Sequence, residues 1–378
     1  MEIAIVMHRL SKSRGGAEGW TTRLIQWLHK QSHSVHLVSS QEPTYEVAQC
    51  VDRLTLYPKC NRFAFSRLVS DDFDRSHIDV VHDMGFGYRC DLFQPHSGSQ
   101  KALDEAHAKS YFGLARIGFE IRRRLGPRKR KLASLAERQF RQLSTRFLAV
   151  SQRVADDLVR FHEVPRERIH VIHNGVDTQL FSPAMRQTNR SIARQQLRAD
   201  DTDFLILCVA HKHQLKGVSN LIKMLHSPSN SKIHLVVVGG QRQHPQERAI
   251  HQNRVTFVGV CDDVLPFYAA ADLFVLPTHY DACSLTVLEA MACGLPVITT
   301  LANGASELIK DQHEGLLLSS STDVPALIKS VETCRCDSLR NFLGRNARQR
   351  VMQHSLESNF AAIENIYREI AFKSRMAA

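Results

Sequence analysis

The chain has 378 residues and a formal net charge of +11, with 43% hydrophobic and 23% charged residues. This composition excludes a disordered or fibrous protein, and the length suits two or three domains with sizeable hydrophobic cores. The positive charge predicts an anionic partner.

The cysteines and the apolar runs indicate the compartment. Nine cysteines are scattered without a CxxC pair or a matching histidine cluster, so we expect free thiols in a reducing cytoplasm and neither a zinc site nor a disulfide framework. The first apolar run, residues 3–7, is too short for a signal peptide, and no later run reaches the roughly 18 apolar residues of a spanning helix. We therefore expect a cytoplasmic protein, soluble or peripheral on the inner face of the cytoplasmic membrane.

Short apolar runs alternate with helical stretches along both halves of the chain. In the first half, a helix is predicted at 17–30 and strands at 3–7, 35–39, 79–82 and 147–151. In the second half, strands are predicted at 204–210, 233–239, 255–259, 273–277 and 297–300. The alternation favours two doubly wound parallel sheets, so the predicted fold class is α/β.

A glycine-rich loop follows the first predicted strand. Gly15 and Gly16 stand in the sequence RGGAE, where the next helix begins. Glycine lets the backbone approach a ligand closely, and a helix N-terminus favours negative charge. The loop therefore suits a diphosphate or an acceptor beside it, and it lacks the GxGxxG pattern of an NAD enzyme.

Basic residues gather in one part of the first half, at Arg122, Arg123, Arg124, Arg128, Lys129, Arg130 and Lys131. Gly126 and Pro127 interrupt this basic cluster, which predicts two helical pieces or a helix and a turn. Two explanations fit the cluster equally well. It forms a solvated basic face, or it docks to anionic lipid headgroups or to a phosphorylated acceptor. We expect no nucleic-acid partner, because no binding-module motif or interleaved aromatic residue accompanies the cluster.

A polar stretch separates the two halves. Residues 172–177 read IHNGVD, and the segment 182–191 that follows is polar. This change of composition predicts a domain boundary near residue 175. A helical pattern at about 355–376 ends the chain.

The segment 280–298, YDACSLTVLEAMACGLPVI, carries the strongest signal. It combines a loop after the predicted strand 273–277 with a helix predicted at 285–292. Ligands bind beyond the carboxyl ends of parallel strands, and the unpaired N–H groups at a helix N-terminus hold phosphate without a metal. Asp281 and Glu289, on either side of this junction, are placed to bind sugar hydroxyls.

Residues 289–292, EAMA, and 294–297, GLPV, resemble the retaining GT-B glycosyltransferases of family 4. The donor site of these enzymes carries a Glu-x7-Glu motif that runs into a helix and strand of this type, and Asp281 stands where the family has the first Glu. The phrases GGAE and NGVD also match the family, so the resemblance covers essentially the whole chain. It implies a GT-B fold, with two Rossmann-like doubly wound parallel-sheet domains that face a cleft.

The resemblance also implies the domain limits. Residues 1–174 would form the acceptor-side domain, and residues 175–357 would form the donor-binding domain. The C-terminal helix, at about 358–378, would cross back to the first domain.

The resemblance assigns donor contacts in the second domain. Glu289 would bind the ribose hydroxyls of the nucleotide, and Asp281 would contact the donor sugar or the reacting centre. The backbone N–H groups around Leu285 and Thr286 would hold the diphosphate. Glu307 matches a further family phrase, although a structural role at a helix start fits it equally well.

Cations for the leaving group are expected after the first strand of the second domain. Lys216 matches a family lysine that faces the leaving diphosphate, where a fixed positive charge would neutralise developing negative charge. His211 stands where the family has Arg, and it is charged only when protonated. Lys212 beside it is expected to compensate.

The first domain is expected to contribute a histidine and the glycine loop. His96 occupies the place of a family histidine that faces the donor sugar, where it would hydrogen-bond to a hydroxyl or help to stabilise charge at the anomeric carbon. His82, after another strand, is the competing candidate. Gly15 and Gly16 match the family loop that lies beside the donor diphosphate or the acceptor.

We therefore expect a retaining hexosyltransferase that moves glucose from UDP-glucose to a lipid-linked or lipopolysaccharide-core glycan. Neither a metal nor another cofactor is expected, because Lys216, loop N–H groups and a helix dipole can stabilise the leaving group. Two other functions remain compatible with the sequence: a GT-B sugar-nucleotide epimerase, and a non-catalytic protein that binds anions or nucleic acid.

Overall fold

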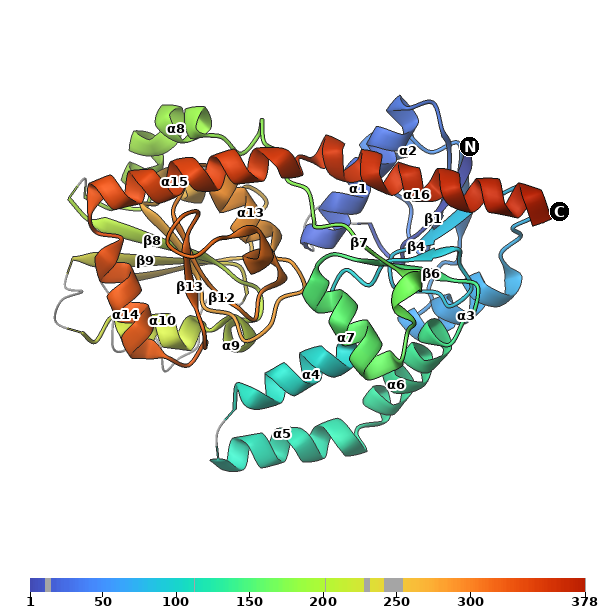
Figure 1. Ribbon diagram of the computed structural model, residues 1–378, viewed down its shortest axis with the longest axis horizontal. Helices are drawn as coiled ribbons and strands as arrows, with labels where there is room; N and C mark the ends of the chain where they lie inside the picture. The colour runs from blue at the N-terminus through green and yellow to red at the C-terminus, as the bar shows by residue number, and fades with distance from the viewer. Residues whose placement is uncertain (11–14, 112, 201, 228–231, 241–253, 378) are drawn as a thin grey trace. The chain divides into compact units, whose positions relative to one another are not determined.

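The computed structural model describes the chain except for residues 11–14, 112, 201, 228–231, 241–253 and 378; the side chains at 122–125, 127–129, 374 and 377 are likewise not described. The chain forms two compact units. Unit 1 comprises Met1–His173 and Glu357–Ala378, and unit 2 comprises Asn174–Leu356. Each unit has a parallel sheet of its own (Figure 1).

Unit 1 is built on a seven-stranded sheet with the order β3-β2-β1-β4-β5-β6-β7. Its strands are β1 Glu2–Val6, β2 Ser34–Ser39, β3 Arg53–Leu56, β4 Val80–Asp83, β5 Leu92–Phe93, β6 Arg146–Ala149 and β7 Ile169–Val171. In the register of β1, Ile3 pairs with Val35 on one side and with Val80 on the other. All four residues of β4 are buried, as expected for a parallel sheet that is covered on both faces.

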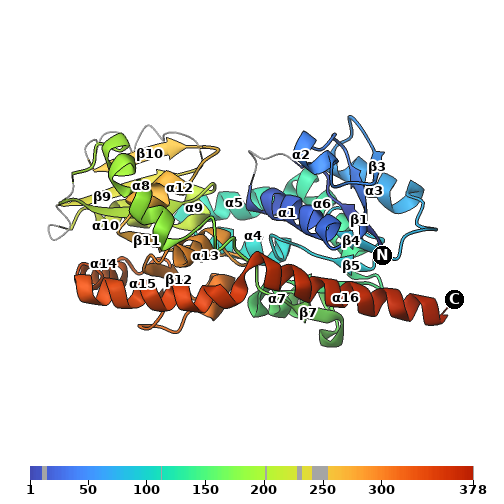
Figure 2. The same cartoon turned by 90° about the horizontal axis from the view of Figure 1, so that it is seen from above.

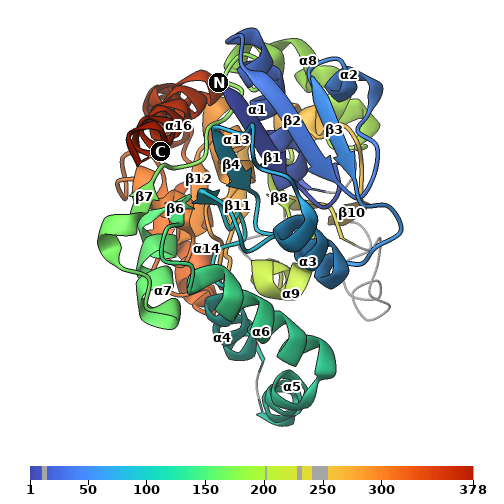
Figure 3. The same ribbon diagram turned by 90° about the vertical axis from the view of Figure 1, so that its right-hand side faces the viewer.

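The described helices of unit 1 before its last one are α1 Gly16–Lys30, α2 Tyr45–Ala48, α3 Arg62–Asp72, α4 Gln100–Lys109, α5 Gly113–Leu125, α6 Pro127–Phe140 and α7 Gln152–His162, with the 3-10 turn η1 Arg166–Arg168. The basic cluster is indeed divided between two helices: Gly126 is the N-cap of α6 and Pro127 is its first residue. Figures 1 and 3 show α5 at the outer edge of this unit, farther from the sheet than α6.

The last helix, α16 Leu356–Ala377, packs along unit 1 (Figures 1 and 2). The hydroxyl of Tyr367 lies 2.6 Å from Nδ1 of His82 in β4. The ring of Phe360 meets the ring of Trp20 in α1 edge-on, with their centroids 5.3 Å apart. The end of the chain therefore completes the core of the first unit.

Unit 2 is built on a six-stranded sheet with the order β10-β9-β8-β11-β12-β13. Its strands are β8 Phe204–Val209, β9 Ile233–Val238, β10 Val255–Gly259, β11 Leu273–Leu276, β12 Val297–Thr300 and β13 Leu316–Leu318. The strand order reverses between β8 and β11. The region beyond the carboxyl ends of these two strands is the switch point, where sheets of this type bind ligands.

The described helices of unit 2 are α8 Pro183–Gln196, α9 His213–Lys216, α10 Val218–Met224, α12 Leu265–Ala270, α13 Leu285–Ala292, α14 Val324–Thr333 and α15 Asp337–Val351, with the 3-10 turns η3 Gly304–Leu308 and η4 Met352–His354. Helix α13 has the bounds that the sequence predicts. It ends before Gly294, which has a φ of 69° in the left-handed region that glycine adopts readily.

The predicted α/β fold class is confirmed, and all the predicted strands are present with ends shifted by two residues or fewer. The prediction missed the short strands β3, β5, β7 and β13. It also missed α8, because the polar stretch 182–191 reads as a linker. In the structure Ser182 caps this helix by accepting from the N–H of Met185 at 3.3 Å.

All nine cysteines are free thiols. Within the described part of the chain, no helix combines the length and the apolar sequence that crossing a bilayer requires. The described His, Cys, Asp and Glu side chains form no group of three or more that could hold a metal ion.

Candidate functional site

Lys216 and Asp281 meet at the switch point of unit 2. Lys216 ends α9, which follows β8, and Asp281 lies in the loop after β11, so the fold joins residues 65 positions apart. The Nζ of Lys216 donates to Oδ2 of Asp281. The two side chains are still 20% and 16% exposed. A partly exposed pair can exchange one partner for a charged ligand at lower cost than a fully buried pair.

The position directly after Lys216 requires glycine, and Gly217 occupies it. It has a φ of 74°, and a Cβ at this position would lie 2.0 Å from the carbonyl oxygen of Pro277. The N–H of His279 also donates to the carbonyl oxygen of Leu215 at 2.8 Å. Helix α9 is thereby held against the end of β11, which positions Lys216.

Asn303 shapes the loop that carries Asp281. Its buried side-chain oxygen accepts from the N–H groups of Ser284 at 3.2 Å and Ala305 at 3.1 Å. Its amide nitrogen donates to Oγ1 of Thr299 at 3.1 Å. One buried amide therefore joins this loop to the start of α13 and to the end of β12.

The N-terminus of α13 follows the loop directly. Ser284 occupies the N-cap, but its side chain contacts Oγ1 of Thr286 at 3.0 Å and caps no N–H of the first turn. First-turn N–H groups have no partner within their own helix. The N–H groups around Leu285 and Thr286 thus coincide with the positive end of the helix dipole, a combination that binds phosphate.

Glu289 lies one turn further along α13 and is half-buried. The hydroxyl of Tyr268, in α12, donates to its Oε2 at 2.7 Å. Tyr268 is fully buried, and burial together with the Glu289 carboxylate raises the pKa of Tyr268 well above its usual value. The phenol therefore stays protonated at neutral pH and donates to the carboxylate.

The remaining predicted residues of unit 2 lie on loops at the same end of the sheet. His211 and Lys212 are exposed between β8 and α9. Glu307 is exposed in η3, which follows β12. Unit 2 thus brings Lys216 and Asp281 into contact and gathers the other predicted donor residues around the carboxyl ends of its strands.

Unit 1 has its own switch point, between β1 and β4. Gly15 is the N-cap of α1 and Gly16 is its first residue, whereas Arg14 lies outside the described residues. His96 follows β5, and its ring meets the ring of Trp20 in α1 edge-on at a centroid distance of 4.8 Å. The fold therefore places His96 against the first turns of the helix that the two glycines begin.

The surroundings of His96 keep its imidazole neutral. Burial lowers its pKa to about 4. Nδ1 lies 3.5 Å from the amide nitrogen of Gln94, and Nε2 is buried without a hydrogen-bond partner in the described part of the chain. A neutral imidazole can hydrogen-bond to a hydroxyl but supplies no positive charge.

His82, the competing candidate, is a core residue. It is 0% exposed in β4 and is hydrogen-bonded to Tyr367. Burial, with a smaller contribution from His96, lowers the pKa of His82 to about 3. His82 is thus enclosed by the core, whereas His96 is partly exposed.

The basic cluster is only partly described. The side chains not described are those of Arg122, Arg123, Arg124, Arg128 and Lys129. Arg130 and Lys131 are exposed on α6. On α5, Leu114, Ile117 and Ile121 are 85%, 56% and 53% exposed, and their spacing places them on one face of the helix. A row of exposed apolar side chains therefore accompanies the cluster.

Comparison with known proteins identifies the family. Residues 14–180 match the model for Glycosyltransferase Family 4, and residues 189–350 match the model for Glycosyl transferases group 1. Together the two models match most of the chain. The chain belongs to the family 4 glycosyltransferases.

Solved structures share the fold of this glycosyltransferase over its whole length. WaaG, a glycosyltransferase involved in lipopolysaccharide biosynthesis, has a TM-score of 0.78 at 22% identity, over 97% of this chain and 99% of WaaG. Alr3699/HepE from Anabaena, solved with UDP-glucose, has a TM-score of 0.72 at 19% identity, over 98% of this chain and 100% of HepE. Identities this low establish the fold alone, and the predicted GT-B fold is confirmed.

Curated relatives align with a shorter part of the glycosyltransferase. The D-inositol 3-phosphate glycosyltransferase of Xylanimonas cellulosilytica is 32% identical over 203 residues, which cover 49% of this chain and 47% of the relative. The chain spans about half the length of the curated relatives it matches.

Two residues that hold the candidate site of this glycosyltransferase were not predicted. Tyr268 lies in LPFYAA, whose apolar residues indicate a core helix, and nothing there marks a partner 21 residues later. Asn303 precedes Gly304, and such a pair signals a turn. The pair does not show that the amide binds a loop 19 residues earlier.

Unit 1 of the glycosyltransferase is expected to lose stability as the pH falls from 7 to 5. His82 and His96 have folded-state pKa values of about 3 and about 4, below the ordinary 6.5, so the unfolded chain binds protons first. Their contribution is complete above pH 6.5 and is lost as the pH falls toward the folded values. Each histidine contributes a slope of about 1.4 kcal/mol per pH unit below about pH 6. Burial raises the pKa of Asp83 to about 6. Asp83 therefore contributes a slope of the opposite sign below that pH, which offsets the slope of one histidine.

Thermal unfolding of the parent and of His82→Gln at pH 7, 6 and 5 measures this effect. Glutamine keeps a hydrogen-bonding group beside Tyr367 but binds no proton. The melting temperature of the variant should fall less than that of the parent between pH 7 and pH 5. An equal fall in both proteins would show that His82 does not contribute to the pH dependence.

Proposed function

We propose that this protein transfers a hexose from a nucleoside-diphosphate sugar to an acceptor hydroxyl, with retention of configuration. The observation that carries the proposal is the contact of Lys216 with Asp281 at the switch point, directly before the N-terminus of α13. A fixed cation, a carboxylate and helix N–H groups gather there, and a sugar diphosphate needs all three.

In the proposed reaction, the bond from the anomeric carbon to the diphosphate breaks through an oxocarbenium-like transition state. The acceptor oxygen attaches to the same face, and its proton passes to the departing diphosphate oxygen. Lys216 neutralises charge on the departing diphosphate, and N–H groups around Leu285 and Thr286 bind its oxygens. Asp281 then contacts the sugar, and Glu289 binds the ribose. Since these groups supply the charge stabilisation, we propose that no metal is required and that excess EDTA leaves the rate unchanged.

The proposed donor is UDP-glucose, the nucleotide sugar present in the HepE structure. Thermal unfolding with a panel of UDP, GDP and ADP sugars tests this choice. A ligand at about 100 times its Kd adds about 2.7 kcal/mol to the free energy of unfolding, so the donor should raise the melting temperature by several degrees. A larger shift with GDP-glucose or ADP-glucose would overturn the choice of UDP.

The proposed acceptor is a lipid-linked glycan or a lipopolysaccharide core. The support is the whole-length likeness to WaaG, which acts in lipopolysaccharide biosynthesis. The curated relatives favour a second candidate, because the Xylanimonas relative is named for inositol 3-phosphate, a small phosphorylated acceptor. Transfer assays with both acceptor types distinguish the two.

We further propose that α5 and α6 dock on anionic lipid at the inner face of the cytoplasmic membrane. Leu114, Ile117 and Ile121 form an exposed apolar row, and the basic cluster follows it along the chain. Apolar side chains of an amphipathic helix enter the headgroup boundary, and each well-placed base adds about 1 kcal/mol near anionic lipid.

Replacing Leu114, Ile117 and Ile121 by Ser is expected to weaken binding to vesicles of phosphatidylglycerol and phosphatidylethanolamine by about ten-fold or more, because the apolar contact is lost. Cosedimentation measures the bound fraction. Ile192→Ser is the matched control, since Ile192 is 60% exposed on α8 of unit 2. If the triple variant and a variant with the bases at 122–131 neutralised both bind like the parent, the docking role is wrong.

A further inference from the structure

Tyr268 is a fully enclosed polar residue beside the candidate site. Its side chain is fully buried, yet its hydroxyl lies 2.7 Å from Oε2 of Glu289 and 3.2 Å from the carbonyl oxygen of Thr286. A phenol has one proton to donate. The shorter contact and the charge of the acceptor direct that proton to the Glu289 carboxylate.

The ring of Tyr268 is held by aromatic neighbours. Phe181 meets it edge-on at a centroid distance of 5.5 Å, and Phe274 in β11 stacks on it at 6.1 Å. Rings packed in this way in a dense core do not change rotamer freely. The core therefore fixes the position of the hydroxyl. The carboxylate of Glu289 is on a flexible, half-buried side chain, so its position depends more on the hydrogen bond.

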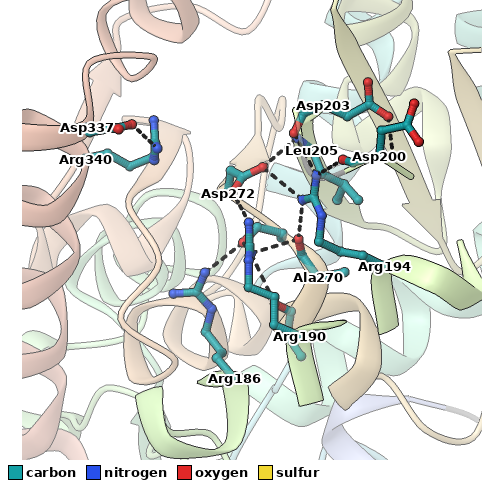
Figure 4. A network of polar contacts seen from close by, with 12 residues as sticks. Arg186, Arg190, Arg194, Asp200, Asp203, Leu205, Ala270, Asp272, Asp337 and Arg340 are labelled. Carbon is teal, nitrogen blue, oxygen red and sulfur yellow. Dashed lines mark hydrogen bonds and ion pairs between the residues drawn. The ribbon is translucent and has the colours of Figure 1, made fainter. Parts of the chain in front are cut away.

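Three arginines of α8 hold the helix that carries Tyr268. Arg186 donates to the carbonyl oxygen of Ala271 at 2.8 Å, and Arg190 donates to that of Ala270 at 3.0 Å (Figure 4). Arg194 donates to the same Ala270 oxygen at 3.1 Å. These carbonyls lie at the C-terminal end of α12, where helix carbonyls lack partners of their own and cations are favoured.

Asp272 ties the same end of α12 to the sheet. It pairs with Arg190 and Arg194, and its Oδ2 accepts from the N–H of Leu205 in β8 at 2.8 Å (Figure 4). A continuous set of contacts therefore runs from α8 through α12 to Tyr268 and Glu289. The arginine-rich segment after the predicted boundary is thereby packed against the rest of unit 2.

We propose that Tyr268 is a positioning residue for Glu289, and that the arginines of α8 hold it in place. The inference rests on the proposed function, in which Glu289 binds the ribose of the donor. The hydrogen bond fixes the carboxylate before the nucleotide arrives, so less freedom is lost on binding. Tyr268 acts through Glu289 and does not contact the reacting atoms.

Tyr268→Phe tests the proposal, because it removes one hydroxyl and keeps the ring. Loss of a hydrogen bond to a charged group is expected to raise the Kd and KM for UDP-glucose by about ten-fold. The kcat and the acceptor KM should change little. A loss of folded protein would have the opposite pattern, with a lower apparent kcat and an unchanged donor KM. In the Glu289→Gln background the same change should cost much less, because the carboxylate is already absent.

Tyr367→Phe is the matched control. It removes another buried tyrosine hydroxyl, bonded to His82 at 2.6 Å in unit 1, so it should lower stability without changing the Kd for UDP-glucose. The proposal is overturned if Tyr268→Phe binds UDP-glucose like the parent, or if Tyr367→Phe loses as much affinity. If the parent itself binds no sugar nucleotide, the proposed function fails first and the inference falls with it.

Discussion

Lys216→Met is expected to lower kcat for sugar transfer by about 10²- to 10³-fold, the range seen when one group that stabilises developing negative charge is removed. Methionine is nearly as long as lysine, so it can keep the packing of α9 against the end of β11. It cannot neutralise the departing diphosphate. Initial rates of nucleoside diphosphate release at saturating donor measure the effect.

Lys329→Met is the matched control, because Lys329 is exposed on α14 of the same unit. It should keep kcat within about two-fold, as surface substitutions away from a site usually do. If Lys216→Met folds, binds donor and keeps the parent's kcat, the cation at the switch point does not stabilise the leaving group.

Glu289→Gln is expected to raise the Kd for the donor by about 10- to 100-fold with little change in kcat. Hydrogen bonds to a charged group contribute about 1.5–3 kcal/mol, and the ribose contacts are the same in the ground state and in the transition state. Isothermal titration calorimetry with UDP-glucose gives the Kd, and steady-state rates give kcat. A fall in kcat with unchanged Kd would place Glu289 at the reacting sugar instead.

Asp281→Asn separates the roles of the two acids. It keeps the size of the side chain and removes the negative charge that we place beside the reacting sugar, so kcat should fall with donor affinity largely kept. Transfer at the parent's rate would leave Glu289 as the one acid with the expected role. Higher activity in Asp281→Glu would show that the shorter side chain found here is a compromise.

The parts of the fold that follow from local pattern were predictable. Buried parallel strands are continuous apolar runs, and α13 is bounded by a loop and by Gly294, so both could be read along the chain. The contact of Lys216 with Asp281 also follows from a general rule, because loops after β8 and β11 meet wherever strand order reverses between them.

The parts that depend on distant partners were not predictable. Tyr268 and Asn303 look like a core aromatic and a turn residue, and their roles come from contacts with α13 and with the loop before it. The sequence of α8 suggested a linker because it is polar. Its arginines bind carbonyl oxygens at the end of α12, more than 70 residues away, and such distant partners leave no local signal. Strand β5 has two residues, too few for any periodic signal.

UDP release by the purified full chain, with and without a lipopolysaccharide-core acceptor, tests the central claim most directly. We predict that UDP-glucose yields UDP and glucosylated acceptor in equal amounts, that release depends on the acceptor, and that Lys216→Met slows it by about 10²- to 10³-fold. Turnover of the donor without any acceptor would indicate an epimerase. No release of nucleoside diphosphate with any sugar nucleotide or acceptor would indicate a non-catalytic binding protein and contradict the proposed activity.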